Sequence, residues 1–156
     1  MGRQDPVNDP VTRFGAYRGI TPLGALTLAT EVCDWRRFPT AGMFMSFTGL
    51  ISSERSNGDR QRRGGITHAG NVHLRTQLVE SAWSYRARPN IGPTLRRRQP
   101  HAHPDTIARS WVAQQRLCAK FGRLDARKHN RKVVVTAVAR ELAGFLWAEM
   151  TADLPQ

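Results

Sequence analysis

The sequence predicts an all-α fold, a compact domain of five to seven helices, and three observations support this class. Apolar residues recur at helical spacing through most of the chain, as in Val134, Val138, Leu142 and Leu146. Capping residues stand beside proline where several helices would begin. Of the 156 residues, 40% are hydrophobic, which is enough to bury the core of one domain. We expect this domain to span residues 9–152, with residues 1–8 and 153–156 as flexible ends.

Two short helices open the domain. Asp9 is expected to cap a helix from about residue 11 to 18, and Thr21 with Pro22 to start a second that ends near Cys33. The tight turn between them contains Gly19 and resembles a helix-hairpin-helix, a motif whose hairpin amides hold a DNA phosphate. The usual second glycine is Thr21 here, so a plain helical hairpin is the alternative.

The middle of the chain alternates helix and loop. Thr40 is expected to cap a helix over residues 41–48, and Gly49 to end it. Residues 50–65 then lose the helical pattern, which predicts a long basic loop, with or without a short hairpin. The next helix starts either at a Thr67 cap or after residues 70–71, and it continues to about Tyr85.

The last third of the chain contains two longer helices. The first is expected from Pro104 to about residue 127, and the second from Lys132 to Thr151. Cys33 and Cys118 both lie in apolar helical patterns, so we expect reduced core thiols in a cytoplasmic protein. No run is long enough to cross a membrane, so no membrane partner is expected.

Charge indicates a polyanionic partner. The net charge is +12, and the basic residues are 21 arginines and 3 lysines. Residues 51–100 contain ten of these arginines and three acids, a local excess of +7. Such concentration favours nucleic acid binding over a merely solvated surface. The predicted nucleic-acid-binding residues are Arg55, Arg60, Arg62, Arg63, Arg75, Arg96, Arg97, Arg98 and Gly19.

The long basic loop also carries serines, including Ser56. A serine among arginines can simply be part of a phosphate-binding loop, or it can attack a phosphodiester and form a covalent phosphoserine link. The chain has only twelve acids and no carboxylate cluster beside this loop, so we predict no metal site in it. His101 and His103 lack a third ligand nearby in the sequence.

Several segments, in order along the chain, resemble one known family. They are residues 19–26 (GITPLGAL), 31–38 (EVCDWRRF), 46–50 (SFTGL), 56–58 (SNG), 65–71 (GITHAGN), 74–75, 78–82 (LVESA) and 139–147 (ARELAGFLW). Together they resemble the C-terminal domain of DEDD transposases of the bacterial insertion-sequence one-ten/one-sixteen group, which are related to Piv-type DNA invertases. The resemblance covers about residues 9–152.

This resemblance implies a two-part recombinase. An N-terminal RuvC-like domain, expected to be absent from this chain, would carry four acidic ligands for a divalent metal such as Mg²⁺. The C-terminal domain would carry a nucleophilic serine and bind DNA, guided by a structured bridge RNA. The family further implies a homo-oligomer in the full-length form and a place beside the bacterial nucleoid in the cytoplasm. No cofactor is expected in this chain itself.

Three departures from the family pattern affect the expected activity. Ser52 replaces a proline, and His68 replaces a lysine. The nucleophile position directly before Gly58 is Asn57, so Ser56 is the candidate nucleophile. We therefore expect a truncated transposase that is inactive alone. The alternatives are a non-catalytic nucleic-acid-binding helical module, or a domain that acts in trans with a separate RuvC-like partner.

Overall fold

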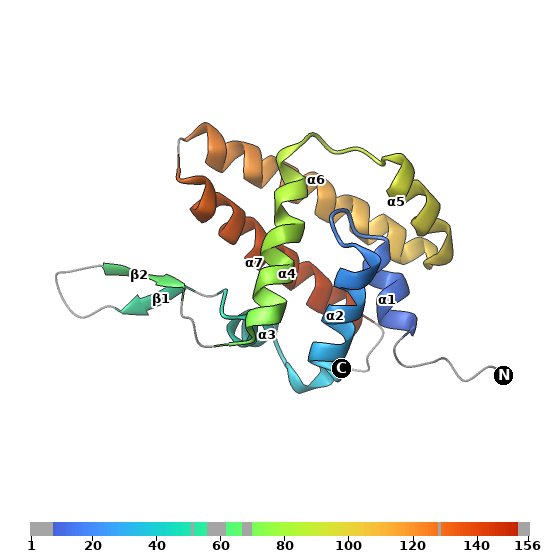
Figure 1. Cartoon of the computed structure of the whole chain (residues 1–156), viewed down its shortest axis with the longest axis horizontal. Helices are drawn as coiled ribbons and strands as arrows, with labels where there is room; N and C mark the ends of the chain where they lie inside the picture. The colour runs from blue at the N-terminus through green and yellow to red at the C-terminus, as the bar shows by residue number, and fades with distance from the viewer. Residues whose placement is uncertain (1–7, 51, 56–61, 67–69, 128, 153–156) are drawn as a thin grey trace.

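The computed structural model describes residues 8–50, 52–55, 62–66, 70–127 and 129–152. These residues form seven α-helices, three short 3-10 helices and one β-hairpin (Figure 1). The α-helices are α1 (Asn8–Gly15), α2 (Pro22–Val32), α3 (Ala41–Thr48), α4 (Val72–Ala82), α5 (Pro93–Arg98), α6 (Pro104–Ala126) and α7 (Arg131–Thr151). The 3-10 helices are η1 (Trp35–Arg37), η2 (Trp83–Arg86) and η3 (Gln99–His101), and the strands are β1 (Ser52–Arg55) and β2 (Arg62–Ile66). The predicted all-α class is confirmed, and the predicted long loop contains the hairpin that was one of its two alternatives.

Helix α7 is the centre of the core. It packs against α3, α4 and α6. Val138, Leu142 and Leu146 follow one another at four-residue spacing along its buried face, and none of them is exposed. Leu74 and Leu78 of α4 are equally buried and belong to the same cluster. Since each such side chain contributes about 1.5–3 kcal/mol when fully buried, the apolar stripe that predicted α7 also supplies much of the core's stability.

An aromatic cluster closes the core beside α3. The ring centroid of Trp35 lies 5.4 Å from that of Phe14 and 4.7 Å from that of Phe44. Trp147 of α7 donates its indole N–H to the backbone carbonyl of Phe38, at 2.8 Å. The aromatic side chains in and beside η1 therefore join the N-terminal helices to α7.

The helix starts follow local chemistry. Thr21 and Thr40 cap α2 and α3 as predicted, because their hydroxyls accept hydrogen bonds from backbone amides three residues on. Asn71 caps α4, which decides between the two predicted starts; Thr67 lies outside the described residues. The prediction for Asp9 was wrong. Helix α1 begins at Asn8, so Asp9 lies inside its first turn, and the Asp9 carboxylate instead pairs with Arg13 one turn on, at 2.9 Å.

One of the two cysteine predictions was also wrong. Cys118 is a buried free thiol, as expected, but Cys33 is exposed. Cys33 follows the last residue of α2 with a positive φ of 60°, and this conformation turns the chain out of the helix toward η1. Helix α2 and its buried face therefore end at Val32, and Cys33 lies just outside them.

The N-terminal helices form the predicted helical hairpin, since α1 and α2 pack against each other on either side of the turn at residues 16–21. Helix α5 was not predicted, and it lies inside the arginine-rich range 51–100, with Pro93 in its first turn. None of the helices in the described part of the chain is both long enough and apolar enough to span a membrane.

Candidate nucleic-acid interface

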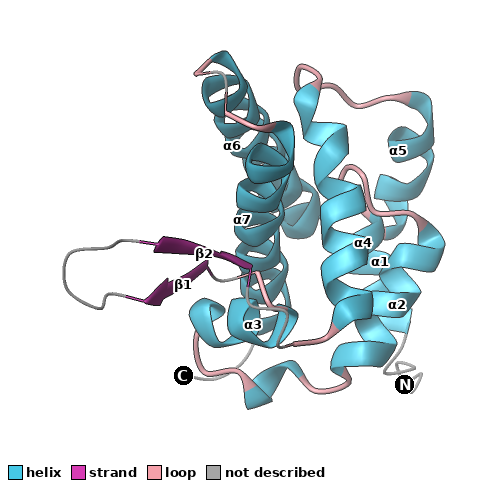
Figure 2. Cartoon of the chain, turned by 60° about the vertical axis from the view of Figure 1, so that its left-hand side comes forward, coloured by secondary structure: helices cyan, strands magenta, loops and turns pink. Residues whose placement is uncertain are grey.

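The β-hairpin leaves the helical body between the end of α3 and the start of α4 (Figure 2). Strand β1 pairs antiparallel with β2, and Arg55 lies opposite Arg62 while Glu54 lies opposite Arg63. Ser56, Asn57 and Arg60 lie outside the described residues. The structure thus brings three of the predicted arginine positions, 55, 62 and 63, into one two-stranded unit.

The base of the hairpin is closed by a tight backbone contact. The amide of Asn71 donates to the carbonyl of Phe47, at 2.8 Å. Gly70 has a φ of 133°, and a Cβ built on it would lie 2.7 Å from both the Phe47 carbonyl oxygen and the Gly49 nitrogen. Only glycine fits this conformation and this approach without strain. The two ends of the hairpin segment are therefore held together at a fixed point of the body.

Asn71 fixes this point to the neighbouring helix. Its side-chain oxygen accepts from the Leu74 amide at 3.1 Å, and its side-chain nitrogen donates to the Glu31 carboxylate of α2 at 2.7 Å. The amide acts as donor and acceptor at once, and an ionised aspartate, which only accepts, could not reproduce both bonds. Gly70 and Asn71, the last two residues of segment 65–71, therefore anchor the loop to the helical body.

Arg75 lies one turn into α4, at the end of the helix nearest the hairpin. One of its guanidinium nitrogens, Nη1, is buried and has no hydrogen-bond partner among the described residues. Its backbone amide bonds to the Asn71 carbonyl at 3.1 Å. The structure therefore places Arg75 in the first turn of α4, which follows the hairpin in the chain.

The arginines of α5 lie elsewhere. In two views turned by 60°, α5 is on the opposite side of the helical body from β1 and β2 (Figures 1 and 2). Arg96 and Arg97 are exposed there. The predicted set of basic residues is therefore not one surface, and the hairpin group is separate from the α5 group.

Arg98 differs from its two neighbours. It is partly buried, its guanidinium donates to the backbone carbonyl of Ile20, and burial lowers its pKa. Gly19 lies beside this contact with a φ of 84°, and a Cβ on it would lie 2.5 Å from the Ser81 carbonyl oxygen. The structure thus gives Arg98 and Gly19 packing roles in the turn between α1 and α2. Their predicted contact with phosphate stays a prediction.

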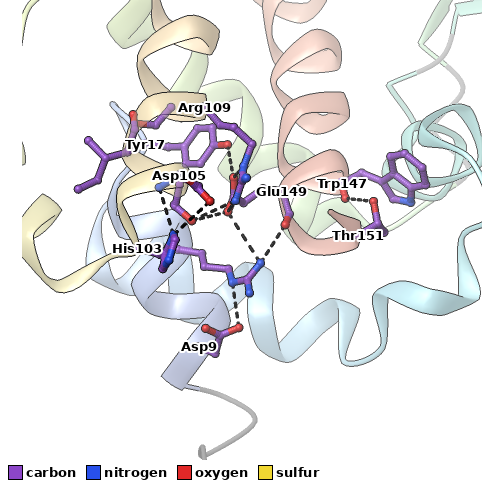
Figure 3. A network of polar contacts seen from close by, with 12 residues as sticks. Asp9, Tyr17, His103, Asp105, Arg109, Trp147, Glu149 and Thr151 are labelled. Atoms are coloured by element: carbon purple, nitrogen blue, oxygen red, sulfur yellow. Dashed lines mark hydrogen bonds and ion pairs between the residues drawn. The ribbon is translucent and has the colours of Figure 1, made fainter. Parts of the chain in front are cut away.

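A buried polar cluster was missed by sequence reasoning. Glu149 of α7 is fully buried and accepts hydrogen bonds from Tyr17 at 2.9 Å, Thr106 at 2.6 Å and Arg109 at 2.7 and 2.9 Å (Figure 3). Burial alone would raise the pKa of Glu149, but these hydrogen bonds and the Arg109 charge lower it below its usual value. The cluster joins the turn after α1 to α6 and α7, and it leaves no oxygen of Glu149 open to a ligand, so we assign it to stability.

A signal for this cluster was present in the sequence. Glu149 continues the buried face of α7, three residues after Leu146 and seven after Leu142. A carboxylate on such a stripe predicts a buried ion pair. No group of three His, Cys, Asp or Glu residues that could hold a metal ion occurs in the described ranges.

Comparison with known proteins identifies the family of this chain. The model of the transposase family IS116/IS110/IS902 matches residues 12–98, which is more than half of the chain. The chain therefore belongs to the IS116/IS110/IS902 transposase family.

Similar curated proteins agree with the family. A putative transposase of Sinorhizobium fredii, y4qE, is 47% identical over 138 residues, which are 88% of this chain and 35% of that protein. A probable family 20 transposase of Pseudomonas aeruginosa is 36% identical over 144 residues, which are 92% of this chain and 36% of that protein. A transposase for the insertion sequence element IS1111A of Coxiella burnetii is 32% identical over 75 residues, 48% of this chain and 21% of that protein. The chain spans about a third of the length of the first two relatives. No solved structure matches it.

Proposed function

We propose that this chain is the DNA-binding portion of an insertion-sequence transposase and that it takes part in DNA transposition. The family match carries this proposal, because residues 12–98 include the hairpin segment, Arg75 and α5. Ten of the chain's 21 arginines lie between residues 51 and 100, and all ten fall within the matched range. Arginine binds phosphate oxygens through a planar fork of donors, so these residues suit a nucleic acid backbone.

The geometry of the hairpin supports this role. The Gly70 contact and the Asn71 anchor hold both ends of the segment, while β1 and β2 extend away from the helical body (Figure 2). A loop with a fixed base loses less conformational freedom on binding than one with a free base. The segment can thus reach a ligand outside the helical body while its base stays fixed beside the start of α4.

The chemistry we propose for the loop uses Ser56. Its hydroxyl oxygen would attack phosphorus and displace one ester oxygen of the DNA. The serine proton would pass to that oxygen, which leaves as a free DNA hydroxyl, and a phosphoserine link would remain between protein and DNA. Neighbouring arginines would offset the charge that develops on the phosphate. The described residues do not fit a divalent-metal site, since no three suitable ligands converge. We place Mg²⁺ on a RuvC-like acidic domain, and a bridge RNA and further copies of the protein complete the proposed assembly.

Covalent capture tests the Ser56 assignment. The chain is mixed with a labelled DNA end and a RuvC-like domain taken from a family member, and adducts are resolved on a denaturing gel. We expect an adduct that Ser56→Ala abolishes and that the matched control Ser53→Ala retains. Because Asn57 occupies the family's nucleophile position, Asn57→Ser should restore the adduct in the Ser56→Ala background. Adducts that persist unchanged in Ser56→Ala would exclude this serine.

Binding by the hairpin is tested without the chemistry. Fluorescence anisotropy with a duplex of about 20 base pairs compares the wild type with a hairpin variant in which four arginines are changed to Gln, namely Arg55, Arg60, Arg62 and Arg63. The control variant removes four exposed basic residues around the α6–α7 connection, namely Arg123, Arg127, Arg131 and Lys132. Both variants reduce the net charge equally. We expect the hairpin variant to bind at least about tenfold more weakly than the control, since log affinity falls with each lost phosphate contact. Equal affinities would contradict a role for the hairpin.

A further inference from the structure

Residues 81–104 contain no Asp or Glu, but they contain five arginines. Four of the five are exposed, namely Arg86, Arg88, Arg96 and Arg97, and we call these four the α5 surface. Among the described residues, none of the four forms an ion pair. Their charge is therefore not offset by neighbouring side chains, unlike that of Arg36 or Arg116, each of which pairs with an acid.

The α5 surface is built on a fixed support. Three side chains from this part of the chain donate to alternate carbonyls in the turn between α1 and α2: Gln99 to residue 16 at 3.3 Å, Tyr85 to residue 18 at 2.6 Å, and Arg98 to residue 20. Tyr85 is buried, and so is Gln99. The support therefore holds η2, α5 and η3 against one turn, and Arg98 belongs to this support rather than to the surface.

The side chain of Arg18 makes the reverse contact. Its guanidinium donates to the Arg88 carbonyl at 2.8 Å and lies 3.5 Å from the side-chain oxygen of Gln114. The same Gln114 oxygen accepts from the backbone amide of Asn90 at 2.6 Å. These bonds fix the connection between η2 and α5, so the backbone that carries Arg88 is held in place before any ligand arrives.

We propose that the α5 surface binds the phosphodiester backbone of a nucleic acid duplex and that this site is separate from the hairpin. The proposal rests on the proposed function for its class of ligand. Four exposed arginines on a fixed backbone, without acids between them in the sequence, can each approach a phosphate oxygen without first breaking an ion pair. The surface and the hairpin lie on opposite sides of the body (Figures 1 and 2), so they contact the bound nucleic acid at two different places and not as one basic patch.

The test changes all four arginines of the α5 surface to Gln and measures affinity by fluorescence anisotropy, with DNA and RNA duplexes in separate arms. The control is the variant at Arg123, Arg127, Arg131 and Lys132, which removes the same charge. We expect the α5-surface variant to bind roughly 10- to 100-fold more weakly than the control. Its slope of log affinity against log salt should be smaller in magnitude than that of the wild type by about 3 to 4, because each lost phosphate contact removes about 0.9. Loss of affinity for either the DNA duplex or the RNA duplex supports the site, and it shows which of the two duplexes the site binds. Thermal melting of each variant confirms that it is folded.

Combination with the hairpin variant tests whether the sites are separate. For independent surfaces, the fold-losses of the two variants multiply within about a factor of two in the combined variant. A combined loss no greater than that of the hairpin variant alone would overturn the proposal, as would an α5-surface variant that binds like the control. If the wild-type chain binds no duplex, the proposed function fails as well. If it binds and only the α5-surface variant is unaffected, the failure is confined to this inference.

Discussion

Replacement of Glu149 by Ala should strongly destabilise the fold. The substitution removes the acceptor of three side chains, and two of the donors, Tyr17 and Thr106, are each only 1% exposed. A buried donor left without a partner costs about 1–3 kcal/mol, so the two together cost about 4 kcal/mol. The Arg109 side chain is 38% exposed and can regain water, so it adds little. We therefore expect the free energy of unfolding to fall by about 4 kcal/mol, which corresponds to about 8–16 °C in Tm for a chain of this size.

Urea denaturation followed by circular dichroism measures this loss. The control is Glu80→Ala on α4, an exposed glutamate whose removal should change the free energy of unfolding by less than about 0.5 kcal/mol. Tyr17→Phe should cost much less in the Glu149→Ala background than in the wild type, because its partner is already gone. A loss of less than about 1 kcal/mol for Glu149→Ala would refute the assignment of this cluster to stability.

Three further predictions concern acid, a glycine and the thiols. The lowered pKa of Glu149 means that its contribution is present above the ordinary value of 4.5 and is lost as the pH falls through the folded value. Urea titrations should therefore show the wild type and Glu149→Gln converging in stability below pH 4.5; a constant difference would contradict this. Gly70→Ala should cost about 1–3 kcal/mol through its positive φ, whereas Gly122→Ala in α6, where nothing lies within 4 Å, should be neutral or stabilising. Equal effects in thermal melts would disprove the Gly70 contact. Cys33 should react with a thiol reagent in the native protein and Cys118 only after unfolding, since Cys33 is exposed and Cys118 is buried with a raised pKa; modification of Cys118 in native Cys33→Ser protein would contradict its burial.

Local chemistry made much of the fold predictable. Thr21 and Thr40 cap their helices through bonds between a hydroxyl and a backbone amide only three residues further on, so the cap can be recognised from the local sequence. The apolar stripe of α7 is likewise a property of one segment. Asp9 shows the limit, because a carboxylate near a helix start can serve as a cap or pair with a residue one turn on, and Arg13 offered the second choice.

The candidate site depended on contacts between distant segments, and sequence alone could not supply these. Arg96, Arg97 and Arg98 are adjacent in the sequence, yet Arg98 turns inward because the Ile20 carbonyl, 78 residues away, accepts its hydrogen bond. The distance between the hairpin and α5 follows from the path of α4 between them, which composition does not reveal. The burial of Glu149 depends on Tyr17, from the turn after α1, and on Thr106 and Arg109 of α6, which converge on it.

The salt dependence of duplex DNA binding by the wild-type chain tests the proposed nucleic acid function most directly. Anisotropy titrations at several salt concentrations give the slope of log affinity against log salt, and each phosphate contact on a duplex contributes about −0.9 to it. With the four arginines of the hairpin and the four of the α5 surface engaged, we expect a slope of about −7. Affinity that does not change with salt, or no binding at low salt, would contradict the account.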